Sequence, residues 1–257
     1  YVDPNKTETG TGLSWESPLG YGKIQDAIDL AGVYYVNSAS EKGVENAEQA
    51  YVFVKGASVT NKGMHTGEAL TFRNGVTVFG CLPASFNDVC GTTHFNDPER
   101  DEVTDANITE FMEKVKAQRE GVASHNTALT TIRGIYTNGT GFTNGKPAVL
   151  DGFDVTAMSV GNPTGEITSP VIDVTPYSGS VQDPAGGLSL CLRNIIIHDN
   201  DASGTATLNV AHIKNALMYE VLMRDNKVSN NGAVLAVDKH AYVVNSTIEG
   251  KTKVADQ

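Results

Sequence analysis

Two short polar segments carry the side chains best suited to chemistry. They read His-Asp-Asn-Asp over residues 198–201 and Arg-Asp-Asn-Lys over residues 224–227, and each follows an apolar run. If the two runs are neighbouring strands, the carboxylates of Asp199 and Asp225 stack beside each other. Stacked carboxylates suit Ca²⁺, which takes several oxygen ligands. A basic side chain beside them could serve as a base or hold an acidic sugar.

A structural explanation competes with this one and is favoured over it. Asp and Asn form turns, and stacked Asn side chains can satisfy one another's hydrogen bonds. A third segment, Asp-Lys-His over residues 238–240, offers an acid or base in its histidine, although a solvated loop is favoured there too. The candidate catalytic residues are Asp199, Asp225 and Arg224, and the first two are also the candidate calcium ligands. The candidate binding residues are His198, Asp201, Lys227, Asp238 and His240. No cofactor besides calcium is expected.

Other chemistry-bearing residues are set aside. Asp151 and Asp154 would lie on opposite faces of a regular strand, so we do not expect them to act as a pair of carboxylates in glycosidic chemistry. Trp15, the only tryptophan, is expected to pack in the protein rather than to bind sugar. The sequence contains no nucleophile elbow, phosphate-binding loop, dinucleotide fingerprint or EF-hand loop, which weighs mildly against an enzyme.

The polar segments belong to a repeat. Four short apolar segments align without gaps, and the last two intervals are both 26 residues, a period typical of solenoids. The segments contain β-branched residues and lack helical periodicity between residues 126 and 257, so we predict a β-solenoid. Stacking would place like side chains in columns. One column would contain Leu150, Leu192, Met218 and Val244, and another Phe153, Ile195, Val221 and Thr247.

The remaining elements are expected to support this repeat. Apolar residues at helical spacing predict a helix over residues 23–32 that Gly32 ends, and strands are predicted at 50–56, 69–72 and 76–79. Residues 81–125 are predicted to be an insertion that contains a second helix over 108–120. The chain would then be one domain over residues 1–257, with a cap at 1–48 and regular coils at 128–254.

Three segments resemble a known family. Tyr-Val-Asp-Pro-Asn at residues 1–5 resembles the start of secreted right-handed parallel β-helix proteins of Gram-negative bacterial surfaces. Arg-Asn-Gly-Val-Thr-Val-Phe-Gly at 73–80 and Leu-Asp-Gly-Phe at 150–153 are similar to the coils of that family. The resemblance implies a pectate-lyase-like right-handed parallel β-helix with a capping helix, at the outer cell surface or secreted. Many members are surface proteins of unknown role and related β-helices are polysaccharide lyases and hydrolases, so the fold alone does not settle function.

Charge and cysteine content exclude several classes. Lys and Arg number 19 against 30 Asp and Glu, and the net charge of −11 disfavours binding to nucleic acid or to anionic membranes. No apolar run reaches the roughly 18 residues of a membrane-spanning helix, so no transmembrane segment is expected. Cys81 and Cys90 either form a disulfide or are two separate buried thiols. Zinc-site spacing is absent from the sequence.

Together these features predict a secreted or cell-surface protein that binds a glycan or another surface molecule, as an adhesin does, and performs no chemistry. The first alternative is a polysaccharide lyase or glycoside hydrolase that acts in a groove on the β-helix. The second alternative is a structural fragment of a larger surface protein. The ligand, the oligomeric state and the presence of further coils after Gln257 are left open.

Overall fold

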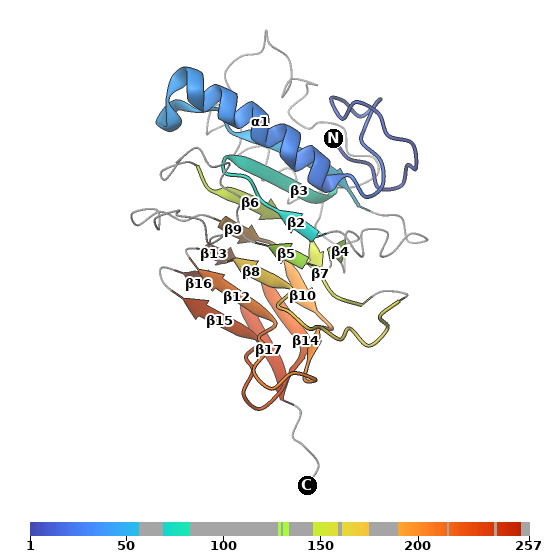
Figure 1. Ribbon diagram of the computed structural model, residues 1–257, viewed down its shortest axis with the longest axis vertical. Helices are drawn as coiled ribbons and strands as arrows, with labels where there is room; N and C mark the ends of the chain where they lie inside the picture. Colours follow the sequence, from blue (N-terminus) through green and yellow to red (C-terminus); the bar gives the residue numbers. More distant parts are fainter. Residues whose placement is uncertain are drawn as a thin grey trace.

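The computed structural model describes residues 1–56, 69–82, 128–129, 131–133, 146–158, 161–174, 190–214, 216–238 and 241–252. Within these residues the chain is mostly β, with parallel sheets, one α-helix and one short 3₁₀ helix. The prediction of a mainly β protein is therefore confirmed. The strands stack along the long axis of the molecule, and the α-helix lies across one end of the stack (Figure 1).

The strands belong to three sheets, named here the first, second and third sheet. The first sheet contains, in spatial order, β1 (Ala50–Lys55), β3 (Val76–Leu82), β6 (Ala148–Asp151), β9 (Leu190–Arg193), β13 (Ala216–Tyr219) and β16 (Tyr242–Val244). The second contains β11 (Asp201–Ala202), β14 (Leu222–Val228), β10 (Ile196–His198), β7 (Asp154–Val155) and β4 (Ala128–Leu129), with β17 (Thr247–Thr252) paired to β14. The third contains β15 (Leu235–Asp238), β12 (Ala211–Lys214), β8 (Ile172–Val174), β5 (Thr131–Arg133) and β2 (Ala69–Thr71).

From β6 onward the chain visits the three sheets in a fixed order. Strands β6, β7 and β8 lie in the first, second and third sheet, and β9, β10 with β11, and β12 follow the same order. Strands β13, β14 and β15 repeat it again, before β16 and β17. Each strand consequently pairs in parallel with the strand one repeat earlier in the sequence. The strands of successive sequence repeats thus pair with one another.

In the first sheet, the pairing of neighbouring strands confirms the first of the two predicted 26-residue intervals and shows that the second was wrong. Leu192 lies opposite Met218, as the gapless alignment predicts. Val243, and not the predicted Val244, lies opposite Met218 on its other side, so the last interval in this sheet is one position shorter. The two valines are adjacent and equally apolar, so the alignment could not tell which of them continues the column. The third sheet departs further from the predicted interval, because Ala211 lies opposite Leu235.

The two predicted columns form buried interior for three of their four members. Leu150, Leu192 and Met218 are buried in one, and Phe153, Ile195 and Val221 in the other. Full burial of such a side chain contributes roughly 1.5–3 kcal/mol, so these columns hold successive strands together. The predicted fourth members are wrong, since Val244 is 45% exposed and Thr247 lies opposite Leu222 rather than Val221.

Helix α1 (Ile24–Lys42) starts near the predicted position but continues well beyond the predicted stop at Gly32. Gly32 is buried, and a Cβ there would stand 2.8 Å from Cγ of Arg73. This glycine therefore allows the helix to approach its neighbour closely, and Gly43 follows the last helical residue instead. The 3₁₀ helix η1 (Val44–Asn46) comes next.

One face of α1 packs on the first strands. Its apolar residues Ile24 and Ile28 are fully buried, and the Tyr35 hydroxyl accepts a 2.9 Å hydrogen bond from the backbone N–H of Lys146. Gln25 bonds both backbone groups of Thr71 in β2, at 2.7 and 3.1 Å. These contacts hold α1 against β2 and against the backbone just before β6.

Most of the predicted insertion at residues 81–125, including its helix over 108–120, lies outside the described residues. Its first two positions belong to β3, which continues to Leu82 rather than ending at Phe79. Cys81 is buried in β3 and Cys90 lies outside the described residues, so the disulfide stays a prediction. No helix of the described residues is both long and apolar enough to cross a membrane.

Candidate functional site

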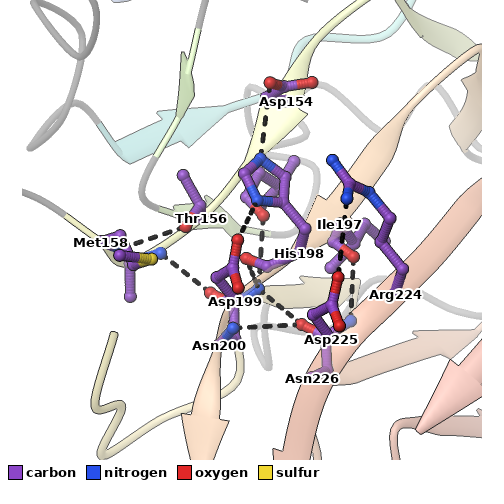
Figure 2. A network of polar contacts seen from close by, with 12 residues as sticks. Asp154, Thr156, Met158, Ile197, His198, Asp199, Asn200, Arg224, Asp225 and Asn226 are labelled. Atoms are coloured by element: carbon purple, nitrogen blue, oxygen red, sulfur yellow. Dashed lines mark hydrogen bonds and ion pairs between the residues drawn. The ribbon is translucent and has the colours of Figure 1, made fainter. Parts of the chain in front are cut away.

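The two polar segments lie side by side in the second sheet. His198 at the end of β10 pairs in register with Arg224 of β14, and Asp201 of β11 pairs with Lys227 of β14. Figure 2 shows the two segments converging with side chains from β7. The sequence repeat therefore places equivalent side chains next to each other, as predicted for this pair of segments.

Two asparagines link the segments from inside. Asn200 and Asn226 are both fully buried. The Asn200 side-chain amide donates a 3.0 Å hydrogen bond to Oδ1 of Asn226, and the Asn226 amide donates a 2.8 Å bond to the carbonyl of Ile197. In the other direction, the backbone N–H of Ala157 donates to Oδ1 of Asn200 at 2.8 Å. The prediction that stacked asparagines satisfy one another is confirmed.

Of the two candidate calcium ligands, Asp199 directly follows β10 and Asp225 lies within β14. Asp199 and Asp225 have φ angles of 53° and 55°, a left-handed conformation that Asp tolerates better than most residues. The Asp199 carboxylate lies 2.8 Å from Nδ1 of His198, and the Asp225 carboxylate lies 3.5 Å from Nη1 of Arg224. Each carboxylate thus faces the basic side chain just before it in the sequence.

His198 has a second carboxylate partner. Its Nε2 lies 3.4 Å from Oδ2 of Asp154, whose side chain is only 8% exposed. Burial of the ring opposes its positive charge, but the hydrogen bonds and charges of Asp154 and Asp199 outweigh burial and raise the pKa of His198. The other oxygen of Asp154, Oδ1, is buried without a hydrogen-bond partner.

Asp201 and Lys227 form another charged pair, with Nζ of Lys227 3.3 Å from Oδ2 of Asp201. The backbone N–H of Ser203 also donates to Asp201, at 2.9 Å. Desolvation favours the neutral acid, but the hydrogen bonds from Ser203 and the interaction with Lys227 prevail and lower the pKa of Asp201. The Asp201 carboxylate is therefore ionised at neutral pH.

The other candidates lie elsewhere. Asp238 ends β15 in the third sheet, where it pairs in register with Lys214, so the structure does not bring it to the polar segments of the second sheet. His240 lies outside the described residues. Trp15 contacts the ring of Tyr1 at 4.7 Å between centroids, and Nζ of Lys55 lies 4.6 Å from its ring centre, as expected for a packing role.

Asp154 is the member of the cluster that sequence reasoning missed. Contrary to expectation, Asp151 and Asp154 do not lie on one strand but end β6 and begin β7, so Asp151 lies in the first sheet beside Arg193 and Asp154 in the second. The gapless alignment of the repeats, however, puts Asp154 opposite Ile196, two residues before His198, and the structure has this register. Because side chains two apart share a face of a strand, that alignment already places Asp154 on the same face as His198.

The described residues contain no group of three or more His, Cys, Asp or Glu side chains arranged to hold a metal ion. The calcium site at Asp199 and Asp225 stays a prediction. Chemically, the arrangement offers paired charges and hydrogen-bonding groups at a sheet surface. Comparison of the chain with protein-family models, curated proteins and solved structures finds no match.

Proposed function

We propose that the chain forms a single right-handed parallel β-helix that is secreted or held at the outer surface of a Gram-negative bacterium. The fixed order in which the chain visits three parallel sheets supports this proposal, as does α1 packed across the first strands. A coil of such a solenoid cannot bury its apolar face alone, which agrees with buried columns shared between successive repeats.

On this scaffold the protein binds a glycan or another surface molecule and leaves it chemically unchanged. The observation that carries the proposal is the recurrence of one charged pair, His198 with Asp199 and then Arg224 with Asp225, on neighbouring strands. Neighbouring strands lie about 4.8 Å apart. A linear polymer along the stack would therefore meet equivalent polar groups on these two neighbouring strands.

The charged groups of the cluster face one another, which disfavours catalysis. A general base needs a lone pair within reach of the substrate proton. Both ring nitrogens of His198 face carboxylates, and the Asp199 carboxylate faces His198 in turn. Side chains held in this way can bind a polar ligand at their exposed edges without reacting with it.

A polysaccharide lyase or glycoside hydrolase is the second candidate. One observation favours it, because a partly buried histidine with a raised pKa between two carboxylates is typical of active sites. In that case Asp199, Asp225 or Arg224 would act on the polysaccharide, and loss of any of them would abolish its cleavage.

A broad glycan-binding screen with a parallel depolymerisation assay, each with and without calcium, tests the proposal. The variant R224A/K227A removes two positive charges from the second sheet and is expected to weaken binding at least tenfold. The matched control K23A/K42A removes two exposed lysines at the two ends of α1, Lys23 just before the helix and Lys42 at its last position. It is expected to bind as the unmodified protein does. Equal losses in the two variants would contradict a binding surface on the second sheet.

A further inference from the structure

One end of the strand stack is covered and the other is open. At the covered end α1 lies across the stack and buries Ile24 and Ile28 (Figure 1). At the opposite end lie β15, β16 and β17, one from each sheet, and among the described strands each of them pairs with a single neighbour. We call the surface formed by these three strands the open end.

The interior columns of all three sheets reach the open end without a cover. Val237, Val243 and Ile248 pair in register with three fully buried residues, Ile213, Met218 and Met223 respectively. Residues paired in this way on stacked parallel strands share a face of their sheet, so the three outermost members belong to the interior face. They are nevertheless 53%, 40% and 43% exposed. The apolar interior therefore meets solvent at this end.

The strand edges at the open end lack the usual protection. A strand at the edge of a sheet presents backbone N–H and C=O groups that can pair with another strand, and proteins commonly blunt such edges with charged side chains or proline. All three residues of β16, Tyr242, Val243 and Val244, are exposed and uncharged. This edge is thus suited to pairing with a further strand.

A second copy of the chain matches the whole open end, whereas a single extended peptide matches only one edge. The occupant must cover three edges and the apolar interior between them, at the spacing with which the repeats of this chain already stack. The open end of another copy has that spacing. Because α1 covers the other end, copies meet open end to open end, and this contact gives a closed two-fold dimer rather than a filament.

We propose that the chain forms a symmetric dimer in which the open ends of two copies pack together, with β16 antiparallel to β16 of the other copy. The two-fold axis passes through β16 because its side chains carry no charge, whereas β17 contains the exposed Glu249, which would there face its own equivalent. The axis then brings β17 of each copy to β15 of the other. The dimer needs no ligand, so it is independent of the proposed binding function.

The size and charge of the open end predict how strongly the copies associate. Its strands have 4, 3 and 6 residues, fewer together than the roughly 20–30 residues a side of a standard interface. Interfaces of standard size range from micromolar to picomolar in affinity, so we expect a dissociation constant in the micromolar range. Each copy has a net charge of −11, so added salt should strengthen the dimer by screening the repulsion between the copies.

Sedimentation equilibrium of the whole chain, from low micromolar to half-millimolar protein, tests this proposal. We expect the unmodified protein to change from monomer to dimer over that range, at lower concentration when salt is added. V243K places two like charges face to face at the centre of the contact and should weaken dimerisation at least tenfold. A chain that stays monomeric at the highest concentration would overturn the proposal and leave the open end to a partner other than a second copy.

Val33 provides the matched control. It is an exposed valine of α1, at the covered end of the stack. V33K should therefore dimerise as the unmodified protein does. If V33K weakens the dimer as much as V243K does, or if the unmodified protein forms species larger than a dimer, the contact is not the one proposed.

Hydrogen exchange keeps the proposal testable if V243K folds poorly. In the unmodified protein, a peptide that covers β16 should exchange at least threefold more slowly at the highest concentration than at the lowest, because dimerisation pairs its outer backbone groups. A peptide that covers β9, which has a strand on each side, should show no such dependence. Equal exchange of the β16 peptide at both concentrations would overturn the proposal.

Discussion

Oδ1 of Asn226 accepts two hydrogen bonds from Asn200, one from its backbone N–H at 3.2 Å and one from its side-chain amide at 3.0 Å. Both residues are fully buried, so water cannot replace these bonds. Because the pair spans two neighbouring repeats of the second sheet, it fixes how the polar segments stand against each other.

Replacing Asn226 by alanine should therefore lower the free energy of unfolding by about 2–4 kcal/mol, since each buried polar group left without a partner costs about 1–3 kcal/mol. Urea unfolding of N226A measures this loss. The control N231A removes an exposed asparagine and should change stability by less than about 0.5 kcal/mol. Similar losses in the two variants would show that the buried pair contributes nothing specific.

Much of this arrangement could be predicted from the sequence, and the failures have physical causes. The columns through Leu192 and Met218 were predictable because apolar residues recur at a fixed interval. The change to Val243 was not, because connections between strands vary in length and the pattern shows no break at two adjacent valines. The predicted helix end at Gly32 was wrong because glycine can either end a helix or permit close packing within one. Only the position of Arg73 beside Gly32 distinguishes the two roles.

A second prediction concerns Glu220, whose φ angle of 54° lies in the left-handed region. Equivalent turns contain Gly152 and Asn194, residues that adopt this conformation more readily. E220G should raise the free energy of unfolding by about 1 kcal/mol, because the left-handed conformation costs an ordinary residue roughly 1–2 kcal/mol. As a control, T247G replaces a residue within β17 by glycine and should be destabilising. Stabilisation of both variants would refute the conformational explanation.

A third prediction compares two residues that pair in register on neighbouring strands of the first sheet, β13 and β16. Met218 is fully buried and Val243 is 40% exposed. M218A should cost about 2–5 kcal/mol, as core truncations do. V243A should cost less than about 1 kcal/mol, because much of its side chain already meets solvent. Thermal unfolding of the two variants provides the measurement, and a larger loss for V243A would contradict the assigned register.

A fourth prediction concerns the contribution of Asp201 to stability at low pH. The pKa of Asp201 is lowered in the folded protein, so its carboxylate stabilises the fold above the ordinary aspartate pKa, and this stabilisation disappears as pH falls through the lowered value. D201N should therefore be less stable than the unmodified protein at pH 7, and the difference should shrink toward pH 2. A difference that stays constant with pH would mean that the carboxylate charge plays no part.

The central claim is that the second sheet binds a polymer without cleaving it. The most direct measurement incubates each glycan identified by the screen with the protein and follows the polymer length by size-exclusion chromatography, while binding is measured on the same sample. We predict undiminished polymer length with binding that R224A/K227A weakens at least tenfold. Shortened polymer with the unmodified protein, and intact polymer with D199N, D225N or R224A, would contradict the claim and establish the protein as an enzyme.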